Sequence, residues 1–99
     1  MSTVFKQLIS SNTPVLLNFY TTWSEDSQTM DAILRDVIAA VGDKGRVIKI
    51  NIEKNQDLIR ALKISSVPTL ILYKNSEMVW RKNGVLEANA LIYIFDKYQ

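Results

Sequence analysis

The 99-residue sequence contains no cysteine and no histidine. Without cysteine the chain cannot form a disulfide, use a thiolate as a nucleophile or hold an iron–sulfur cluster through sulfur. Without histidine it has no imidazole base for a Ser-His-Asp triad and no histidine ligands for zinc. The side chains left for chemistry are carboxylates, lysines, tyrosines and hydroxyls, so the commonest kinds of nucleophilic and metal-assisted catalysis are excluded.

Charge of one sign and long apolar runs are also scarce. The 12 Lys and Arg residues exceed the 10 Asp and Glu residues by a net charge of only +2, and the basic residues are scattered. Nucleic-acid binding needs a clustered basic stripe, and a membrane span needs about 20 apolar residues. The start of the sequence also lacks the charged and apolar regions of a signal peptide. We therefore expect a cytoplasmic protein that binds neither nucleic acid nor a membrane.

The remaining composition is that of an ordinary globular protein. Hydrophobic residues make up 47% of the chain and charged residues 22%. A chain of this length can build one hydrophobic core, and no linker or repeat divides it. The sequence therefore predicts a single domain over residues 1–99, and nothing in it calls for a metal or another cofactor. The oligomeric state is not predicted.

Apolar periodicity predicts an alternation of helices and strands. Helices are expected at 3–11, 55–62 and 87–98, with a long helix after residue 27 that ends at Gly42; strands are expected at 15–20, 47–52, 69–73 and 78–82. The strand at 15–20 is apolar on both alternating faces except at Asn18, which is typical of a central strand. The long helix carries one apolar stripe, formed by Met30, Ile33, Leu34, Val37, Ile38 and Val41.

This order of elements, together with four local motifs, resembles the thioredoxin family from residue 15 to residue 98. The motifs are the strand 15–20 followed by Trp23, the strand and polar turn at 49–53, the segment 64–70 that contains Pro68, and the hairpin 73–77 followed later by Gly84. The resemblance implies an α/β thioredoxin-like fold: a four-stranded mixed sheet, built from βαβ and ββα units with helices on both faces. We expect this fold without the family's usual first strand, since the first element predicted in the sequence is a helix.

The chain departs from the family at the positions that carry the chemistry. The resemblance places Ser24 and Ser27 at the two redox-cysteine positions and Asn18 where the family usually keeps a buried aspartate. Disulfide exchange requires a thiolate, and a serine hydroxyl neither ionises usefully at neutral pH nor forms an S–S bond. No thiol–disulfide exchange is therefore expected, and no residue is assigned a catalytic role.

The resemblance also implies a groove that does not depend on the thiols. The peptide before Pro68 is expected to be cis, the backbone of Val67 to pair with an extended partner, and Trp23 and Gly84 to border the same surface. Our hypothesis is a non-catalytic module that binds a protein or peptide segment near Trp23 and Pro68.

Two other functions stay open at this point. The first is an ordinary thioredoxin whose cysteines at positions 24 and 27 were changed to serine in the laboratory. Asn18, Ala32 and the Glu25–Asp26 pair argue against it, because a simple double substitution would leave those positions in family form. The second is a structural or oligomerising domain that has no ligand in the groove.

Other chemistry around Ser24 is less well supported. Ser24 has no histidine to act as its general base, and a carboxylate such as Glu25 is a poor base at neutral pH. Glu25, Asp26 and Asp31 could offer oxygen ligands to a hard cation. However, acidic residues in a first helical turn complement the helix dipole, and Ser24 or Thr22 can cap that turn. The sequence therefore favours helix capping over a metal or anion site.

Overall fold

The strand β1 (Val15–Tyr20) lies inside the sheet, as its apolar sequence predicts. The computed structural model describes residues 3–99, in which β1 pairs in parallel with β2 (Arg46–Asn51) and antiparallel with β3 (Thr69–Lys74). β4 (Glu77–Asn83) pairs antiparallel with β3, so the order across the sheet is β2-β1-β3-β4. The structure therefore has the predicted four-stranded mixed sheet.

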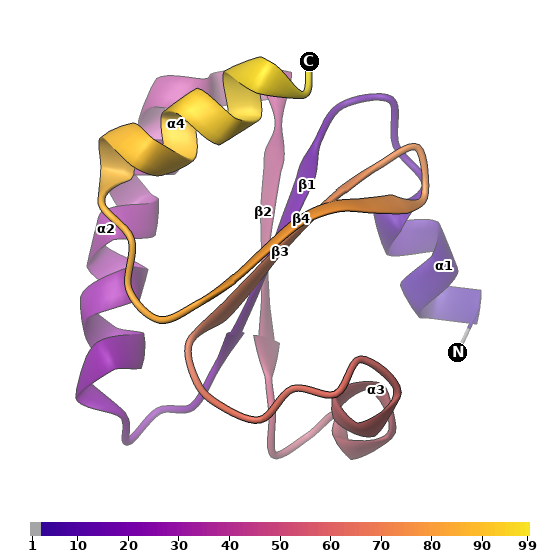
Figure 1. Cartoon of the computed structure of the whole chain (residues 1–99), viewed down its shortest axis with the longest axis vertical. Coiled ribbons are helices and arrows are strands. Elements are labelled where there is room, and N and C mark those ends of the chain that lie inside the picture. Colours follow the sequence, from indigo (N-terminus) through magenta and orange to yellow (C-terminus); the bar gives the residue numbers. More distant parts are fainter. Residues whose placement is uncertain (1–2) are drawn as a thin grey trace.

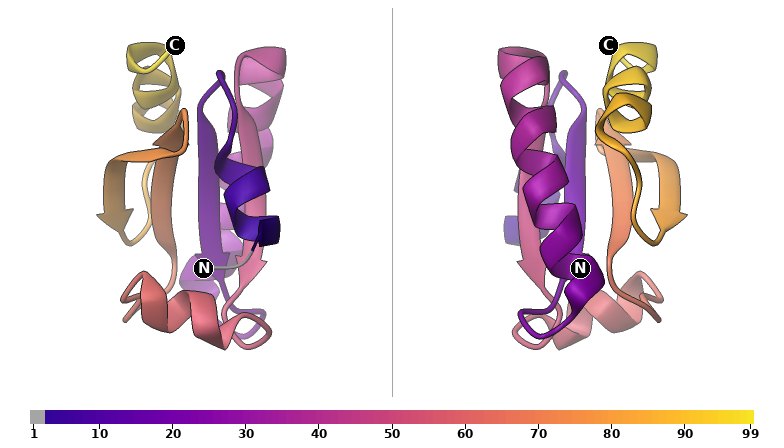
Figure 2. Two further views of the ribbon diagram at one scale, coloured as in Figure 1. Left: turned by 90° about the vertical axis from the view of Figure 1, so that its right-hand side faces the viewer. Right: turned by 90° about the vertical axis from the view of Figure 1, so that its left-hand side faces the viewer.

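Helices cover both faces of this sheet (Figures 1 and 2). α1 (Thr3–Ile9) and α3 (Gln56–Ala61) lie on one face, and α2 (Glu25–Val41) and α4 (Ala88–Lys97) lie on the other. A short 3₁₀ turn, η1 (Gly42–Lys44), joins α2 to β2. Three layers result, with the sheet seen edge-on between the helices in Figure 1.

The two faces of the sheet build two separate hydrophobic clusters. Alternate residues of a strand point to opposite faces, so β1 supplies Leu17 and Phe19 to one cluster and Leu16 to the other. The cluster beneath α1 and α3 includes Phe5, Ile9, Val15, Leu17, Phe19, Ile50, Leu62, Ile71 and Tyr73. The cluster beneath α2 and α4 includes Leu16, Met30, Leu34, Val37, Leu70, Leu72, Leu91 and Phe95.

The long helix α2 follows its predicted stripe with one exception. Met30, Leu34 and Val37 are buried, and the helix ends at Gly42, whose positive φ of 61° suits glycine. Ile38, which belongs to the same apolar stripe, is not buried with them: 49% of this residue is exposed. Ile38 stands seven residues after Asp31, on the side of α2 that faces the outer edge of the sheet rather than its centre.

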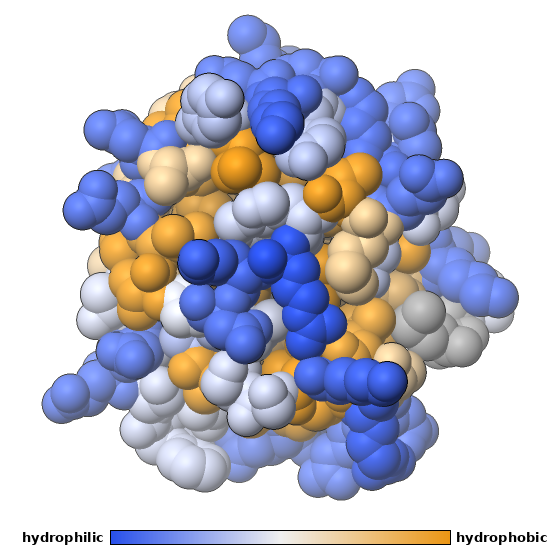
Figure 3. Space-filling view, in the orientation of Figure 1, coloured by the Kyte–Doolittle hydropathy of each residue, from blue (hydrophilic) through white to orange (hydrophobic). Residues whose placement is uncertain are grey.

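The other predicted elements are present, and their ends differ from the predictions by one or two residues. The hairpin between β3 and β4 turns through Asn75 and Ser76, both with positive φ, and a bulge lies between Leu72 and Tyr73. β4 is an edge strand, and hydrophilic side chains cross the middle of the face that it presents in Figure 3. Within residues 3–99, no helix has both the length and the apolar character that crossing a membrane requires.

Candidate functional site

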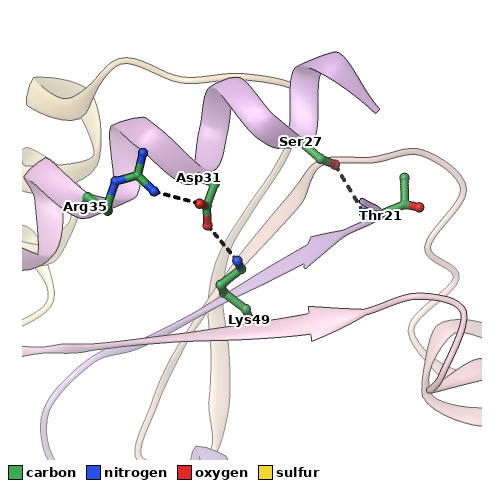
Figure 4. Close-up of polar contacts among 5 residues, drawn as sticks. All are labelled: Thr21, Ser27, Asp31, Arg35 and Lys49. Carbon is green, nitrogen blue, oxygen red and sulfur yellow. Dashed lines mark hydrogen bonds and ion pairs between the residues drawn. The ribbon is translucent and has the colours of Figure 1, made fainter. Parts of the chain in front are cut away.

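The two serines at the start of α2 act as hydrogen-bond acceptors for the backbone. Ser24 is the N-cap: its hydroxyl oxygen accepts from the N–H of Ser27 at 3.2 Å. The hydroxyl oxygen of Ser27 accepts from the N–H of Thr21 at 3.3 Å and is buried (Figure 4). These bonds stabilise the loop between β1 and α2.

Of the two predicted capping residues, the structure uses Ser24 and not Thr22. The backbone carbonyl of Thr22 accepts from the side-chain amide of Gln28 at 3.1 Å. Glu25 and Asp26 occupy the first turn of α2 and are exposed, where they complement the helix dipole.

Asp31 is held by two cations and is not part of a carboxylate cluster. Its side chain forms ion pairs with Lys49 at 2.7 Å and Arg35 at 3.0 Å (Figure 4). The hydrogen bond from Lys49 lowers the pKa of Asp31 below its ordinary value of 3.8. Among residues 3–99 no three acidic side chains gather in a way that could hold a metal ion. The cation site considered from the sequence is therefore not assembled.

Asn18 lies in the interior without a polar partner. It is fully buried, stands beside Lys49 of β2 and Leu70 of β3, and neither Nδ2 nor Oδ1 has a hydrogen bond within the described part of the chain. The ammonium group of Lys49 instead pairs with Asp31 and lies 4.7 Å from the centre of the Tyr20 ring. Because an amide does not ionise at neutral pH, this position cannot carry a proton to or from a neighbouring group.

The turn before β3 lies at the end of β1, where the loop of residues 21–24 leads into α2. Thr69 pairs with Phe19, so Pro68 lies beside the carboxyl end of β1. The Val67–Pro68 peptide is cis, and the carbonyl of Pro68 accepts from the N–H of Gly84 at 2.8 Å. The backbone N–H and C=O of Val67 have no hydrogen bond among residues 3–99.

Trp23 and Gly84 lie at the same end of the sheet as this turn. Trp23 is 74% exposed, unusual for so large an apolar side chain. Gly84 has a φ of 90°, and no atom lies within 4 Å of the place where a Cβ would be. The structure thus brings an exposed aromatic ring, an unpaired backbone at Val67 and an open glycine to the end of the sheet where β1 ends and β3 begins.

Two side chains that the sequence did not single out hold this end of the molecule in place. The guanidinium of Arg81, on β4, donates to the carbonyls of Leu62 at 2.6 Å and Lys63 at 3.0 Å. The hydroxyl of Thr69 contacts the Ser66 carbonyl at 2.7 Å. These bonds tie the segment before Val67 to the sheet. No sequence pattern could reveal them, because both depend on contacts made by irregular backbone.

Comparisons with known proteins agree with this geometry. The family model described as Thioredoxin matches residues 1–97. The chain is 40% identical over 89 residues to the chloroplastic thioredoxin Y of Oryza sativa subsp. japonica, covering 89% of this chain and 53% of the relative. It is 37% identical over 87 residues to a thioredoxin-like protein of Synechocystis sp., covering 88% and 83%. The chain thus spans about half the length of its chloroplastic relatives, and most of the bacterial one.

Solved structures give the same result for the fold. A structure of thioredoxin-2 from the malaria parasite superimposes with a TM-score of 0.85 at 29% identity, covering 88% of this chain and 84% of the other. A mutant thioredoxin from Halobacterium salinarum gives 0.86 at 28% identity, covering 99% and 85%. The segment matched by the family model, residues 1–97, includes the whole sheet and the positions of Ser24, Ser27 and Pro68. This chain belongs to the thioredoxin family.

Proposed function

We propose that this chain is a thioredoxin-like protein without redox activity that binds an extended peptide or protein segment at the carboxyl end of β1. The observation that carries the proposal is the unpaired backbone of Val67 at the end of the sheet where the 74% exposed ring of Trp23 also lies. Free backbone groups in an extended segment are the usual means by which a protein captures a peptide strand.

The chemistry of the site supports the loss of redox activity. Thiol–disulfide exchange proceeds by attack of a thiolate on sulfur, and the chain has no thiol. The hydroxyls of Ser24 and Ser27 both accept hydrogen bonds from backbone N–H groups. With no histidine in the chain and an amide at Asn18, neither hydroxyl has a base that could activate it.

Three features of the site suit an extended partner. The N–H and C=O of Val67 can exchange hydrogen bonds with the partner backbone, as in a β-ladder. Trp23 offers a rigid apolar ring, and such rings often dominate binding energies. Gly84 has no side chain, so the partner backbone can approach it closely.

The proposal is tested by panning the purified chain against a random linear-peptide phage library and measuring the affinity of the enriched peptides by calorimetry. Trp23→Ala should weaken their binding by about 30-fold or more, since hot-spot aromatics contribute 2 kcal/mol or more. In the amide NMR spectrum, the N–H of Val67 should become protected from solvent exchange when a peptide binds.

Tyr93→Ala is the matched control, because Tyr93 is also an exposed aromatic, 67% accessible, but lies on α4. This variant should change the affinity by less than about twofold. If no peptide is enriched, or if Trp23→Ala and Tyr93→Ala have the same effect, the groove is not the binding site.

A further inference from the structure

The outer edge of β2 carries backbone groups that nothing in the described chain uses. β2 is the last strand on its side of the sheet. The N–H of Arg46, the first residue of β2, donates to the carbonyl of Pro14 at 3.0 Å. The N–H of Ile52, just past the end of β2, donates to the carbonyl of Tyr20 at 3.1 Å. Alternate residues of a strand direct their N–H and C=O groups to opposite sides. The groups of Val47 and Lys49 therefore point away from the sheet, and within residues 3–99 they have no partner.

A groove runs along this edge on one face of the sheet. It has a volume of about 650 Å³ and lies between α1, β2 and α3, which Figure 2 (left) shows on the same face. Its apolar walls include Val4, Leu8, Ile48, Leu58 and Ala61. Val4 is 66% exposed, so this wall is unusually open to water for an aliphatic side chain.

On the opposite face the same edge is bordered by positive charge. Asp31, Arg35 and Ile38 follow one another at helical spacing along the side of α2 that meets β2. Lys49 and Arg35 share the single carboxylate of Asp31 (Figure 4). About half of the Lys49 side chain remains exposed. One cation in this group is thus left without a full counter-charge.

We propose that the outer edge of β2 is a docking site for an extended peptide segment with alternating apolar and acidic residues. The segment adds to the sheet beside β2 and pairs with the free N–H and C=O groups of Val47 and Lys49. Its apolar side chains enter the groove beneath Val4 and Leu8, and its carboxylates face Arg35 and Lys49. This surface is separate from the one around Trp23 and Val67.

Charge selects this occupant over a second copy of the chain. β2 contains Arg46 and Lys49 and no acidic residue, so two β2 edges paired with each other would bring like charges together. The other edge of the sheet, β4, also has unpaired backbone, but the groove of about 650 Å³ does not adjoin it. The edge of β2 thus combines free backbone, an apolar wall and unbalanced charge.

The probe for the test is the synthetic peptide acetyl-Thr-Val-Glu-Val-Glu-Val-Thr-amide, titrated into the ¹⁵N-labelled chain. Binding should slow solvent exchange of the Val47 and Lys49 amides by about tenfold or more and leave that of Val67 unchanged. Arg35→Glu should weaken the peptide by about fivefold or more, and a peptide with Lys in place of Glu should then bind this variant better than the native chain. Lys82→Glu makes the same charge change on exposed β4 and should alter the affinity by less than about twofold.

Val47→Pro removes one outward N–H donor without removing a bond of the native sheet, and should abolish peptide binding while the circular dichroism spectrum is retained. Trp23→Ala should leave this binding intact, which separates it from the groove proposed above. The proposal is overturned if the peptide at millimolar concentration leaves the Val47 and Lys49 amides unprotected, or if Arg35→Glu and Lys82→Glu act alike. Protection of the same amides by concentration-dependent dimerisation, without peptide, would also overturn it and make a second copy the occupant.

Discussion

Replacing Asn18 by leucine should stabilise the protein. Asn18 is fully buried, and both polar atoms of its side chain lack hydrogen-bond partners in the described structure. Leucine has the same number of side-chain heavy atoms and the same branching at Cγ. Asn18 lies on the same face of the sheet as the apolar cluster that contains Leu16 and Leu70. An aliphatic side chain therefore suits these surroundings better than an amide does.

The size of the effect follows from the cost of an unsatisfied buried group, which is about 1–3 kcal/mol. The more bulky methyl groups of leucine oppose this gain through packing strain of about 1 kcal/mol, at the low end of the usual range. The free energy of unfolding should therefore rise by about 1 kcal/mol, and by about 2 kcal/mol at most. For a domain of this length each kcal/mol corresponds to about 4–8 °C, so Tm should increase by about 4–8 °C.

The assay is urea unfolding followed by circular dichroism, with Thr69→Val as the matched control. Thr69 is equally buried, but its hydroxyl contacts the Ser66 carbonyl at 2.7 Å and Oδ1 of Asn83 at 3.2 Å. Its removal should lower the free energy of unfolding by about 1–2 kcal/mol, with an unchanged m-value in both variants. If Asn18→Leu destabilises the protein as much as Thr69→Val, the amide of Asn18 is satisfied in solution and the reasoning is refuted.

Three further predictions concern stability. Ser24→Ala removes the cap of α2 and should lower the free energy of unfolding by about 1 kcal/mol in the same urea assay. Asp31→Asn should lower it by less than about 1 kcal/mol at pH 7, because the ion pair with Lys49 is partly exposed. The pKa of Asp31 is lowered in the folded state, so its stabilising effect is present above 3.8 and is lost as the pH falls through the lowered pKa; the Tm values of variant and native chain should therefore converge as the solution is acidified. Gly45→Ala would place a Cβ 2.5 Å from the ring of Phe95, and differential scanning calorimetry should show a loss of about 1–3 kcal/mol.

Much of the fold could be predicted because short apolar runs and strong stop signals dominate the local structure. The apolar run at 15–20 shows no helical periodicity, which leaves a strand as its only interpretation. Pro14 marks the end of the first helix and Gly42 the end of the long helix. What could not be predicted depends on how distant elements pack. Whether Ile38 is buried depends on which side of α2 meets the sheet, and periodicity alone places Ile38 on the same stripe as Val37.

The site was predictable to a different extent. The positions of Ser24, Ser27 and Pro68 followed from motifs that resemble a known family, and the absence of thiols was visible in the composition. The partners of individual polar groups were not, because they are set by side-chain directions in three dimensions. For example, Lys49 of β2 forms an ion pair with Asp31 of α2. This ion pair keeps Asp31 from forming a cation site with Glu25 and Asp26, which the sequence alone allowed.

The unequal exposure of the two tryptophans gives the folded protein two separate optical probes. Trp23 is 74% exposed, whereas Trp80 is half-buried against the cluster beneath α4. An aqueous quencher such as iodide should therefore reach the indole of Trp23 first, while the blue-shifted part of the emission belongs to Trp80. The emission of Trp23 can therefore report peptide binding at the end of β1, and that of Trp80 the unfolding of the sheet. Both can be followed in one spectrum, without attaching a dye to the chain.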